Sequence, residues 1–362
     1  MIKFYDLNKQ DKLISNKIYL KIKKVIKNKN FINGAEINEF EKKFSNYLNI
    51  KYSVACSNGT DALTIALKSL NLSKGSEVII PGMTYISTCF AVINSGLKPV
   101  LVDVDYNTGL MDFDNLIKKI TKKTKVIMPV HLYGNVFDTK KLQKKIKRKI
   151  YIIEDCSQSH GAISNNKKRV GSFSDISCFS LYPGKNLGAY GDAGIICTNS
   201  KKLSQNMRKM VNLGLDINSK FNHEIVGCNN RMDTLQAAIL KEKINILDKN
   251  NKKRKKIAEI YQKKILNKKI RLIKYTKGSV YHQFIVLTNN RKFFQKYMMK
   301  NNIQTAIHYP KSINQHKSLK KLFKKISLPN SERLAKNCVS IPIDPFLSKK
   351  GILKIAEVIN RF

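Results

Sequence analysis

Short apolar runs alternate with longer segments of helical period from residue 35 onward. The apolar runs predict strands at residues 77–81, 99–104, 125–130, 151–154, 175–181 and 193–198. The segments between them predict helices at residues 36–48, 60–70, 86–94, 113–120, 139–146 and 202–212. This alternation is typical of a mainly parallel sheet covered by helices. Ligands bind such sheets at the carboxyl ends of the strands, so we expect chemistry in the loops that follow these runs.

The pattern changes near Arg231, where one long helical stretch spans residues 232–265. Its first half is apolar and its second half is rich in lysine, which indicates a helix that connects two domains. The rest predicts a smaller α+β domain, with a strand at 281–287, a helix at 292–300, an extended segment at 305–308 and a closing helix at 348–360. We therefore expect an N-terminal segment of residues 1–34, a large domain of residues 35–245 and a small domain of residues 246–362.

The composition of the chain limits the class of protein and the cellular compartment that we expect. The N-terminus lacks an apolar core of signal-peptide length, and no apolar run approaches the roughly 18 residues of a membrane span. The seven cysteines are odd in number and form no C-x-x-C pair. They favour buried thiols in a reducing compartment over disulfides or a metal site. We expect a cytoplasmic protein without a membrane partner and without a bound metal.

The net charge of +43, from 68 Lys and Arg against 25 Asp and Glu, raises the question of a nucleic-acid partner. The lysines are spread over nearly all the helix-like segments, and aromatic residues are not interleaved with them at stacking intervals. That distribution is typical of solvated helix faces rather than of a nucleic-acid groove. A basic surface could still help to capture a small polyanion such as a nucleoside diphosphate.

One lysine and one carboxylate stand out against this background. Asp155 follows the apolar run at 151–153, and Lys185 lies thirty positions later (185 − 155) in the sequence FSLYPGKNLG. An amine and a carboxylate so placed could bracket an electron-sink cofactor. A lysine that forms a Schiff base must be partly neutral, and its ordinary pKa of roughly 10.4 then requires a desolvated pocket. On residue type alone, Lys185 could equally be a surface lysine and Asp155 a turn cap.

A possible phosphate site lies at the start of the helix predicted at 60–70. The sequence Ser-Asn-Gly-Thr at 57–60 offers capping side chains and a glycine, and free backbone N–H groups at a helix start can hold a phosphate. The same residues also suit any ordinary helix start. Gly188, Gly191 and Gly194 have the spacing G-x-x-G-x-x-G, which differs from the dinucleotide-binding fingerprint.

Three ordered motifs carry a family resemblance. They are EDCSQSHGA at 154–162, SLYPGKNLGAYGDAG at 180–194 and GCNNRMDTLQAA at 227–238. Together they resemble the pyridoxal-phosphate-dependent sugar aminotransferases of the DegT/StrS type, and the similarity runs from residue 31 to residue 342. The resemblance implies the α/β fold of fold type I transferases, a mainly parallel seven-stranded sheet flanked by helices, with a smaller α+β C-terminal domain. It also implies a homodimer with shared active sites.

The resemblance assigns roles to individual residues. Lys185 would form an internal aldimine with pyridoxal 5′-phosphate and then act as the proton shuttle. Asp155 would pair with the pyridinium nitrogen, Tyr85 would stack on the ring, and Gln158 would reach the phenolate oxygen. Outside this context Tyr85 would be read as a core tyrosine.

Further positions follow from the same resemblance. Gly59, Thr60 and Ser180 would hold the cofactor phosphate, and Asn229 would reach it from across the dimer. His160, His308 and Tyr309 are candidates for the sugar pocket, although a lone histidine is more often structural. Neither His131 nor His282 forms a metal-ligand pair in the sequence.

The implied reaction is ping-pong transamination of a keto sugar attached to a nucleoside diphosphate, with glutamate as the expected amino donor. The loop around Lys185 is most similar to members that act at carbon 3 of a dTDP-linked 3-keto-6-deoxyhexose, in amino-sugar and polysaccharide biosynthesis. One alternative keeps the cofactor but makes the enzyme a sugar dehydratase or an aromatising enzyme, which would not depend on an amino donor. The other is a basic dimer that binds nucleic acid or regulates, against which the intact Lys185 and Asp155 argue.

Overall fold

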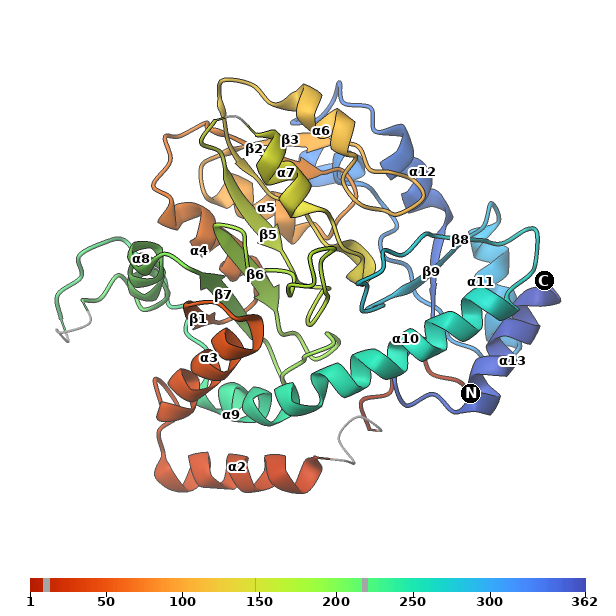
Figure 1. The fold of residues 1–362 in the computed structure, drawn as a ribbon, viewed down its shortest axis with the longest axis horizontal. Coiled ribbons are helices and arrows are strands. Elements are labelled where there is room, and N and C mark those ends of the chain that lie inside the picture. The colour runs from red at the N-terminus through yellow and green to blue at the C-terminus, as the bar shows by residue number, and fades with distance from the viewer. Residues whose placement is uncertain (9–13, 147, 217–220) are drawn as a thin grey trace.

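The computed structural model describes residues 1–8, 14–146, 148–216 and 221–362 (Figure 1). Its larger sheet has seven strands in the order β1-β7-β6-β5-β4-β2-β3. β2 through β6 run parallel to one another, and β7 runs antiparallel to both of its neighbours, β1 and β6. The prediction of a mainly parallel seven-stranded sheet is therefore confirmed. The strands are β1 Tyr52–Cys56, β2 Glu77–Pro81, β3 Lys98–Val102, β4 Thr124–Ile127, β5 Tyr151–Asp155, β6 Ile176–Ser180 and β7 Gly194–Thr198.

Helices cover both faces of this sheet. Successive side chains of a strand point to opposite faces, so Ile196 joins the core beneath α4, α5 and α8, whereas Ile195 joins the core beneath α3 and α9. A third apolar cluster packs α6 and α7 onto the β2–β5 region. The helices are α3 Ala35–Leu48, α4 Gly59–Ser69, α5 Ser87–Asn94, α6 Phe113–Lys119, α7 Thr139–Lys145, α8 Lys201–Val211 and α9 Thr234–Lys243.

A long helical stretch leads from the large sheet to a second, smaller sheet (Figure 1). It consists of α9, one 3₁₀ turn at Ile244–Ile246 and α10 Leu247–Lys264, which confirms the predicted helix at 232–265 apart from that turn. The small sheet has the antiparallel order β10-β9-β8, formed by Cys338–Ile341, Phe284–Leu287 and Arg271–Leu272. It is accompanied by α11 Arg291–Lys300, α12 Pro329–Asn337 and α13 Lys349–Asn360. The domain boundary at residue 245 stays a prediction.

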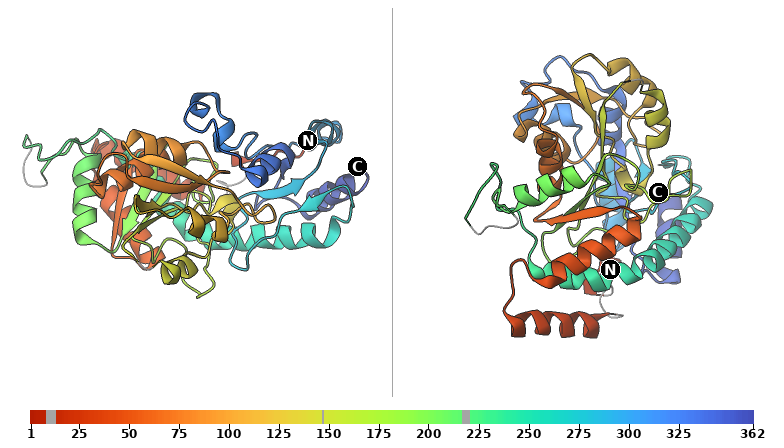
Figure 2. Two further views of the ribbon diagram at one scale, coloured as in Figure 1. Left: turned by 90° about the horizontal axis from the view of Figure 1, so that it is seen from above. Right: turned by 60° about the vertical axis from the view of Figure 1, so that its left-hand side comes forward.

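The N-terminal segment has more structure than its lysine-rich sequence suggests. Helix α2 Ser15–Asn28 packs on α9, where Ile18 is fully buried beside Ile239. Before this helix, Ile2 forms a bridge to Ile303, so the first residues lie beside the small domain (Figure 2). Residues 9–13 of the predicted N-terminal segment lie outside the described residues.

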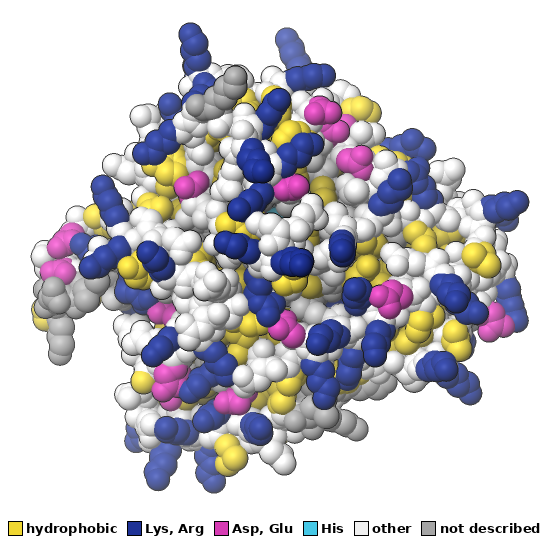
Figure 3. Space-filling view, in the orientation of Figure 1, with side chains coloured by type: hydrophobic (Ala, Val, Ile, Leu, Met, Phe, Trp, Pro, Cys, Tyr) yellow, Lys and Arg dark blue, Asp and Glu magenta, His cyan; other side chains and the backbone are white. Residues whose placement is uncertain are grey.

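The elements that were not predicted include the 14-residue helix α2 and the shorter elements β1, β8, α12 and β10. The extended segment predicted at 305–308 forms only a single bridge, from Ala306 to Ser340. Lysine and arginine side chains are scattered over the face shown in Figure 3, and they are not gathered into one stripe. No helix within the described parts of the chain is both long enough and apolar enough to span a bilayer.

Candidate active site

A cavity of about 800 Å³ opens where the carboxyl ends of β5 and β6 meet the N-terminus of α4 and residues of the small domain. Chemistry was expected at these strand ends. The cavity brings together most of the residues singled out in the sequence. Those that line it are Gly59, Thr60, Tyr85, Asp155, Gln158, Ser180, Lys185, His308 and Tyr309.

Asp155 ends β5 and is held rigidly. Its Oδ2 accepts a hydrogen bond of 3.0 Å from the Thr88 hydroxyl, and its Oδ1 accepts one of 3.1 Å from the backbone N–H of Ser157. The Thr88 hydroxyl lies 2.9 Å from that of Thr84, which is thus its donor. Only 5% of Asp155 is exposed. A carboxylate fixed in this way can pair with a cationic ring nitrogen in the cavity.

Lys185 lies in the loop after β6, where its backbone N–H donates to Tyr182 at 2.9 Å. Burial lowers the pKa of Lys185 to about 8, and the nearby charge of Asp155 raises it only in part. A substantial fraction of this amine is consequently neutral near pH 8, as a nucleophilic lysine requires. The desolvated pocket that Schiff-base chemistry demands is present around Lys185.

The N-terminus of α4 forms one end of the cavity. At the start of α4 the Asn58 side chain accepts a 2.9 Å hydrogen bond from the N–H of Asp61, while the first N–H groups of the helix have no intrahelical partner. Gly59 lies against Ser180, so close that an added Cβ would lie 2.5 Å from the Ser180 Cβ. This end can hold an anion with backbone N–H groups and a hydroxyl.

Gln158 joins two parts of the cavity wall. Its Oε1 accepts a 2.6 Å hydrogen bond from the N–H of Tyr133, and its Nε2 donates to the Tyr309 hydroxyl at 3.0 Å. The rings of Tyr85 and Tyr309 are 5.4 Å apart and tilted by 44°. Tyr85 is half exposed, so its ring faces the cavity rather than the core. The core interpretation of Tyr85 does not fit this position.

His308 is fixed by the small domain and by the N-terminus. Its Nδ1 lies 2.8 Å from the Ser340 hydroxyl, and its ring stacks on Phe4 at 5.8 Å. Burial and then the charge of Lys185 lower the pKa of His308 to about 4, so the imidazole is neutral at physiological pH. Tyr5 continues the N-terminal wall and donates a 2.9 Å hydrogen bond to the carbonyl of Pro183, in the loop that carries Lys185.

Two predicted site residues do not line the cavity. His160 is buried behind it, with its ring 5.4 Å from Phe179, and burial lowers its pKa to about 3. Asn229 is exposed in the segment between α8 and α9, at a bridge to Asn212. A role for Asn229 in the cavity would require a second copy of the chain.

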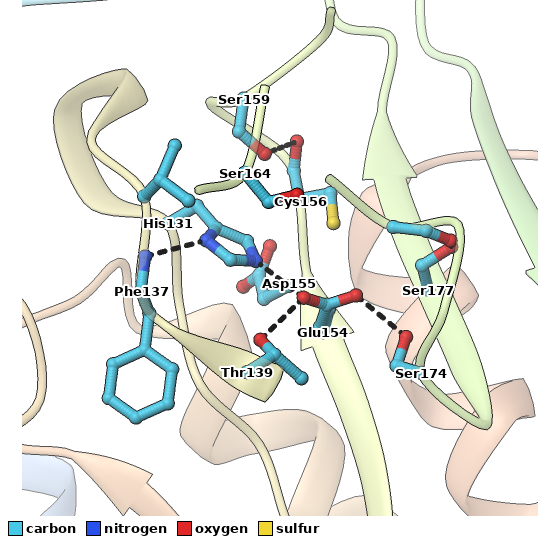
Figure 4. Close-up of polar contacts among 12 residues, drawn as sticks. His131, Phe137, Thr139, Glu154, Asp155, Cys156, Ser159, Ser164, Ser174 and Ser177 are labelled. Carbon is cyan, nitrogen blue, oxygen red and sulfur yellow. Dashed lines mark hydrogen bonds and ion pairs between the residues drawn. The ribbon is translucent and has the colours of Figure 1, made fainter. Parts of the chain in front are cut away.

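A buried polar network lies behind Asp155 (Figure 4). The Glu154 carboxylate accepts hydrogen bonds from His131 Nε2 at 3.1 Å, from Thr139 at 2.6 Å and from Ser174 at 2.7 Å. His131 Nδ1 accepts from the N–H of Phe137, so the imidazole proton is on Nε2. Burial raises the pKa of Glu154, but these hydrogen bonds outweigh that effect and lower it overall.

This network also bears on metal binding, because His131 has no ligand partner near it in the sequence. In the structure one potential ligand atom each from His131, Glu154 and Cys156 lie within 4.8 Å of one another. Both imidazole nitrogens and both carboxylate oxygens are already hydrogen-bonded. A metal ion would have to displace those bonds, so the cluster is a structural network.

Sequence reasoning missed several residues that line the cavity. They include Thr88, in a stretch whose pattern predicts only a helix, and Arg254, in a lysine-rich stretch whose pattern predicts a solvated face. They also include His282 and Asp344, for which the sequence predicts no role in binding. No local motif marks these residues, because each enters the cavity from a different element and only the folded chain brings them together.

Comparison with known proteins accounts for this arrangement. The chain belongs to the DegT/DnrJ/EryC1/StrS aminotransferase family, which it matches over residues 12–360. The chain is therefore an enzyme of an aminotransferase family, and its fold is that of the solved members.

Two curated relatives and two solved structures illustrate the similarity. The chain is 40% identical to a dTDP-3-amino-3,6-dideoxy-α-D-galactopyranose transaminase of Aneurinibacillus thermoaerophilus, covering 100% of this chain and 99% of that protein. It is 37% identical to a UDP-2-acetamido-2-deoxy-3-oxo-D-glucuronate aminotransferase of Pseudomonas aeruginosa, covering 99% and 100%. The structure of DesV from S. venezuelae superimposes with a TM-score of 0.96 at 32% identity, covering 99% and 98%. NtdA from Bacillus subtilis, solved with bound cofactor PMP, gives 0.88 at 30% identity, covering 96% and 81%.

Proposed function

We propose that this protein transfers an amino group from an amino acid to a keto sugar attached to a nucleoside diphosphate, with pyridoxal 5′-phosphate as cofactor. The observation that carries the proposal is the pairing, inside one cavity, of a lysine whose pKa is about 8 with a rigidly held carboxylate, Asp155. Membership of the family and the transaminase activities of its relatives support the same reaction class.

The residues of the cavity fit this cofactor. An anion-binding end at Gly59, Thr60 and Ser180 suits a phosphate, and the close approach of Gly59 to Ser180 leaves no room for a side chain there. Asp155 suits a protonated ring nitrogen, and the exposed face of Tyr85 suits a flat ring. When bound, pyridoxal phosphate withdraws electrons from the carbon that loses or gains the amino group.

Lys185 has two tasks in this proposal. Its Nζ would hold the cofactor, and the same amine would carry a proton to and from the carbon that loses or gains the amino group. The pKa of about 8 suits both tasks, because a group that must accept and return a proton works best near the operating pH. Thr88 and Ser157 meanwhile keep the Asp155 carboxylate in place.

The sugar substrate is proposed from the relatives and from the cavity. A dTDP-linked 3-keto-6-deoxyhexose is the first candidate, since the relative with 40% identity is a transaminase for a dTDP-3-amino-3,6-dideoxy sugar. His308 and Tyr309 line the cavity and could contact the sugar, whereas His160 is buried behind the wall and could act only indirectly. Glutamate is the proposed donor, and synthesis of amino sugars for polysaccharides is the proposed purpose.

We also propose a homodimer in the cytoplasm. Val226, three positions before Asn229, is 97% exposed, and the exposed apolar residues Tyr19 and Leu20 lie on α2. Such side chains suit an interface with a second copy. If the active site is shared, mixing Lys185→Ala subunits with Asn229→Ala subunits should restore part of the activity that each variant lacks. A mixture as inactive as its components would argue against the shared site.

The test of the function is the absorbance spectrum of the purified enzyme with pyridoxal phosphate. Adding glutamate should move the visible band to the near-ultraviolet band of the aminated cofactor, and adding the dTDP-keto sugar should restore the visible band. A visible band that no amino acid changes would favour the dehydratase or aromatising alternative, which shares the cofactor. Absence of any band would reopen the non-enzymatic alternative of a nucleic-acid-binding or regulatory dimer.

A further inference from the structure

The wall of the cavity formed by the small domain contains a group of buried polar atoms without partners. Arg254 comes from α10, Gln283 precedes β9 and Asp344 follows β10, and all three line the cavity. In each residue one side-chain atom is buried without a hydrogen-bond partner: Nε of Arg254, Oε1 of Gln283 and Oδ2 of Asp344. Buried polar groups are nearly always hydrogen-bonded, so three such atoms in one wall indicate a binding site for a polar ligand.

Arg254 is the centre of this group. Only 3% of it is exposed, and its Nη1 donates a 2.9 Å hydrogen bond to the carbonyl of Ile343. Burial lowers the pKa of Arg254, while the nearby Asp344 carboxylate raises it and so favours the charged form. The guanidinium is therefore anchored at one end, charged, and able to offer its Nε edge to the cavity.

The other charges in the cavity decide what Arg254 can bind. Among the described residues that line the cavity, Arg254 and Lys185 are the only lysines or arginines. His282 cannot add a cation, because burial and then the charges of Lys185 and Arg254 hold its pKa well below the ordinary value. His308 is neutral for the same kind of reason. Lys185 is used by the reaction, so Arg254 is left to recognise an anion.

We infer that Arg254 binds the α-carboxylate of the amino-acid donor. The inference rests on the proposed function. The α-carboxylate is bonded to the carbon that carries the amine, so it must lie near Lys185, whereas the diphosphate of a sugar nucleotide is several bonds from a keto group at carbon 3. His282 Nδ1 lies 3.0 Å from Oδ1 of Asn186, the residue after Lys185, and His282 Nε2 lies 3.4 Å from Nε2 of Gln283. The wall that contains Arg254 therefore adjoins the loop that carries Lys185. Arg254 thus lies where the donor carboxylate arrives.

The first test needs no variant. L-Isoglutamine replaces the α-carboxylate of glutamate by a neutral amide, and L-glutamine replaces the side-chain carboxylate instead. In the first half-reaction, followed by cofactor absorbance, L-isoglutamine should react about 10- to 100-fold less efficiently than glutamate, as expected for a lost charge-assisted hydrogen bond. L-Glutamine should retain more activity than L-isoglutamine. The opposite ranking would overturn the inference.

The second test uses Arg254→Gln, which removes the positive charge. Arg254→Lys keeps the charge but loses the planar guanidinium group with its paired N–H donors. Arg361→Gln, at an exposed position, is the control. Arg254→Gln should lose the discrimination between glutamate and L-isoglutamine, while the second half-reaction with the keto sugar keeps its rate. Arg254→Lys should retain part of the discrimination. A variant that loses only the sugar half-reaction would show that Arg254 serves the sugar and would refute the inference.

A binding measurement separates this inference from the proposed function. L-2-Hydroxyglutarate has the α-carboxylate but no amine, so its binding can be followed by calorimetry whether or not the enzyme transaminates. The wild-type protein and Arg361→Gln should bind it, and Arg254→Gln with an unchanged melting temperature should bind at least about tenfold more weakly. Equal binding by wild type and Arg254→Gln would overturn the inference, even if transamination is confirmed. Failure of every amino acid to change the cofactor spectrum would reject the proposed function alone.

Discussion

The hydroxyl of Thr88 donates a 3.0 Å hydrogen bond to the Asp155 carboxylate, across 67 positions of the sequence. Thr88 is completely buried in the first turn of α5, and Asp155 ends β5. The Thr88 hydroxyl accepts a hydrogen bond from Thr84 and donates one to Asp155. These two bonds fix the orientation of the Asp155 carboxylate, and so the direction of its remaining lone pairs. The orientation of the Asp155 carboxylate, on which the proposed pairing with a ring nitrogen rests, therefore depends on Thr88.

We predict that Thr88→Val, which keeps the shape but removes the donor, slows the first half-reaction by about tenfold or more, because hydrogen bonds to charged groups contribute about 1.5–3 kcal/mol. Thr88→Ser keeps the hydroxyl and should stay within about threefold of wild type. Single-turnover absorbance measurements with saturating glutamate give both rates. Equal rates for the two variants would show that Thr88 only fills space.

The close packing at Gly59 yields a second prediction. Gly59→Ala would place a Cβ 2.5 Å from the Ser180 Cβ, which forces α4 away from the end of β6 and disturbs the anion-binding end of the cavity. We expect the affinity for pyridoxal phosphate to fall by at least about tenfold. Equilibrium dialysis measures it, and Gly351→Ala in α13 is the control, since that helix lies outside the cavity. Unchanged affinity in Gly59→Ala would place the phosphate elsewhere.

The Glu154 network should matter for stability. Glu154→Ala leaves the buried donors of His131 and Thr139 without an acceptor and leaves Ser174 only the Ile176 carbonyl at 3.1 Å, so we expect a loss of about 3–5 kcal/mol in the free energy of unfolding. Glu154→Gln keeps an acceptor oxygen and should cost much less. Urea unfolding near pH 7 measures both, and the exposed Glu357→Ala, which loses a surface pair with Arg361, should change stability by less than about 1 kcal/mol.

The pH dependence of the same network has a definite sign. The folded pKa of Glu154 lies below the unfolded value, so its contribution is present above the unfolded pKa of 4.5 and is lost as the pH falls through the folded pKa. The stability gap between wild type and Glu154→Gln should therefore close below pH 4.5. A chelator should leave the melting temperature unchanged, because the network holds Glu154 by hydrogen bonds; a drop would show that a metal holds it instead.

The sequence predicted the elements with a clear apolar pattern better than those whose pattern is interrupted by polar residues. The apolar run of β2 and the apolar period of α3 are patterns that burial demands in any context, so the places of these elements could be predicted. β1 is as long as β2, but Ser53 in β1 and Ser340 in β10 interrupt the apolar runs, and these segments become strands because the edges of β7 and β9 offer hydrogen-bonding partners. α2 was missed because its lysines conceal a narrow apolar stripe that is buried only by α9.

The residues of the candidate site also fall into a predicted group and a group that was not predicted. Lys185, Asp155 and Gly59 lie in contiguous motifs, so the sequence could mark them, and the cavity unites them. Arg254 and Asp344 are separated by 90 positions (344 − 254) and have no motif. Their importance depends on two buried atoms without partners, a property of the folded chain alone.

Burial of Lys185 should make the folding stability of the cofactor-free protein depend on pH. The pKa of Lys185 is about 8 in the folded state against 10.5 when exposed. Below pH 8 the amine is charged in both states, and its burial costs native stability; above pH 10.5 it is neutral in both, and the cost is gone. Between these values the unfolded chain binds more protons, so wild type gains stability with rising pH relative to Lys185→Met. We expect a relative gain of about 1–3 kcal/mol. Urea unfolding of both proteins at pH 7 and pH 10 measures it, and a gap that does not change with pH would mean that Lys185 is as well solvated as a surface lysine.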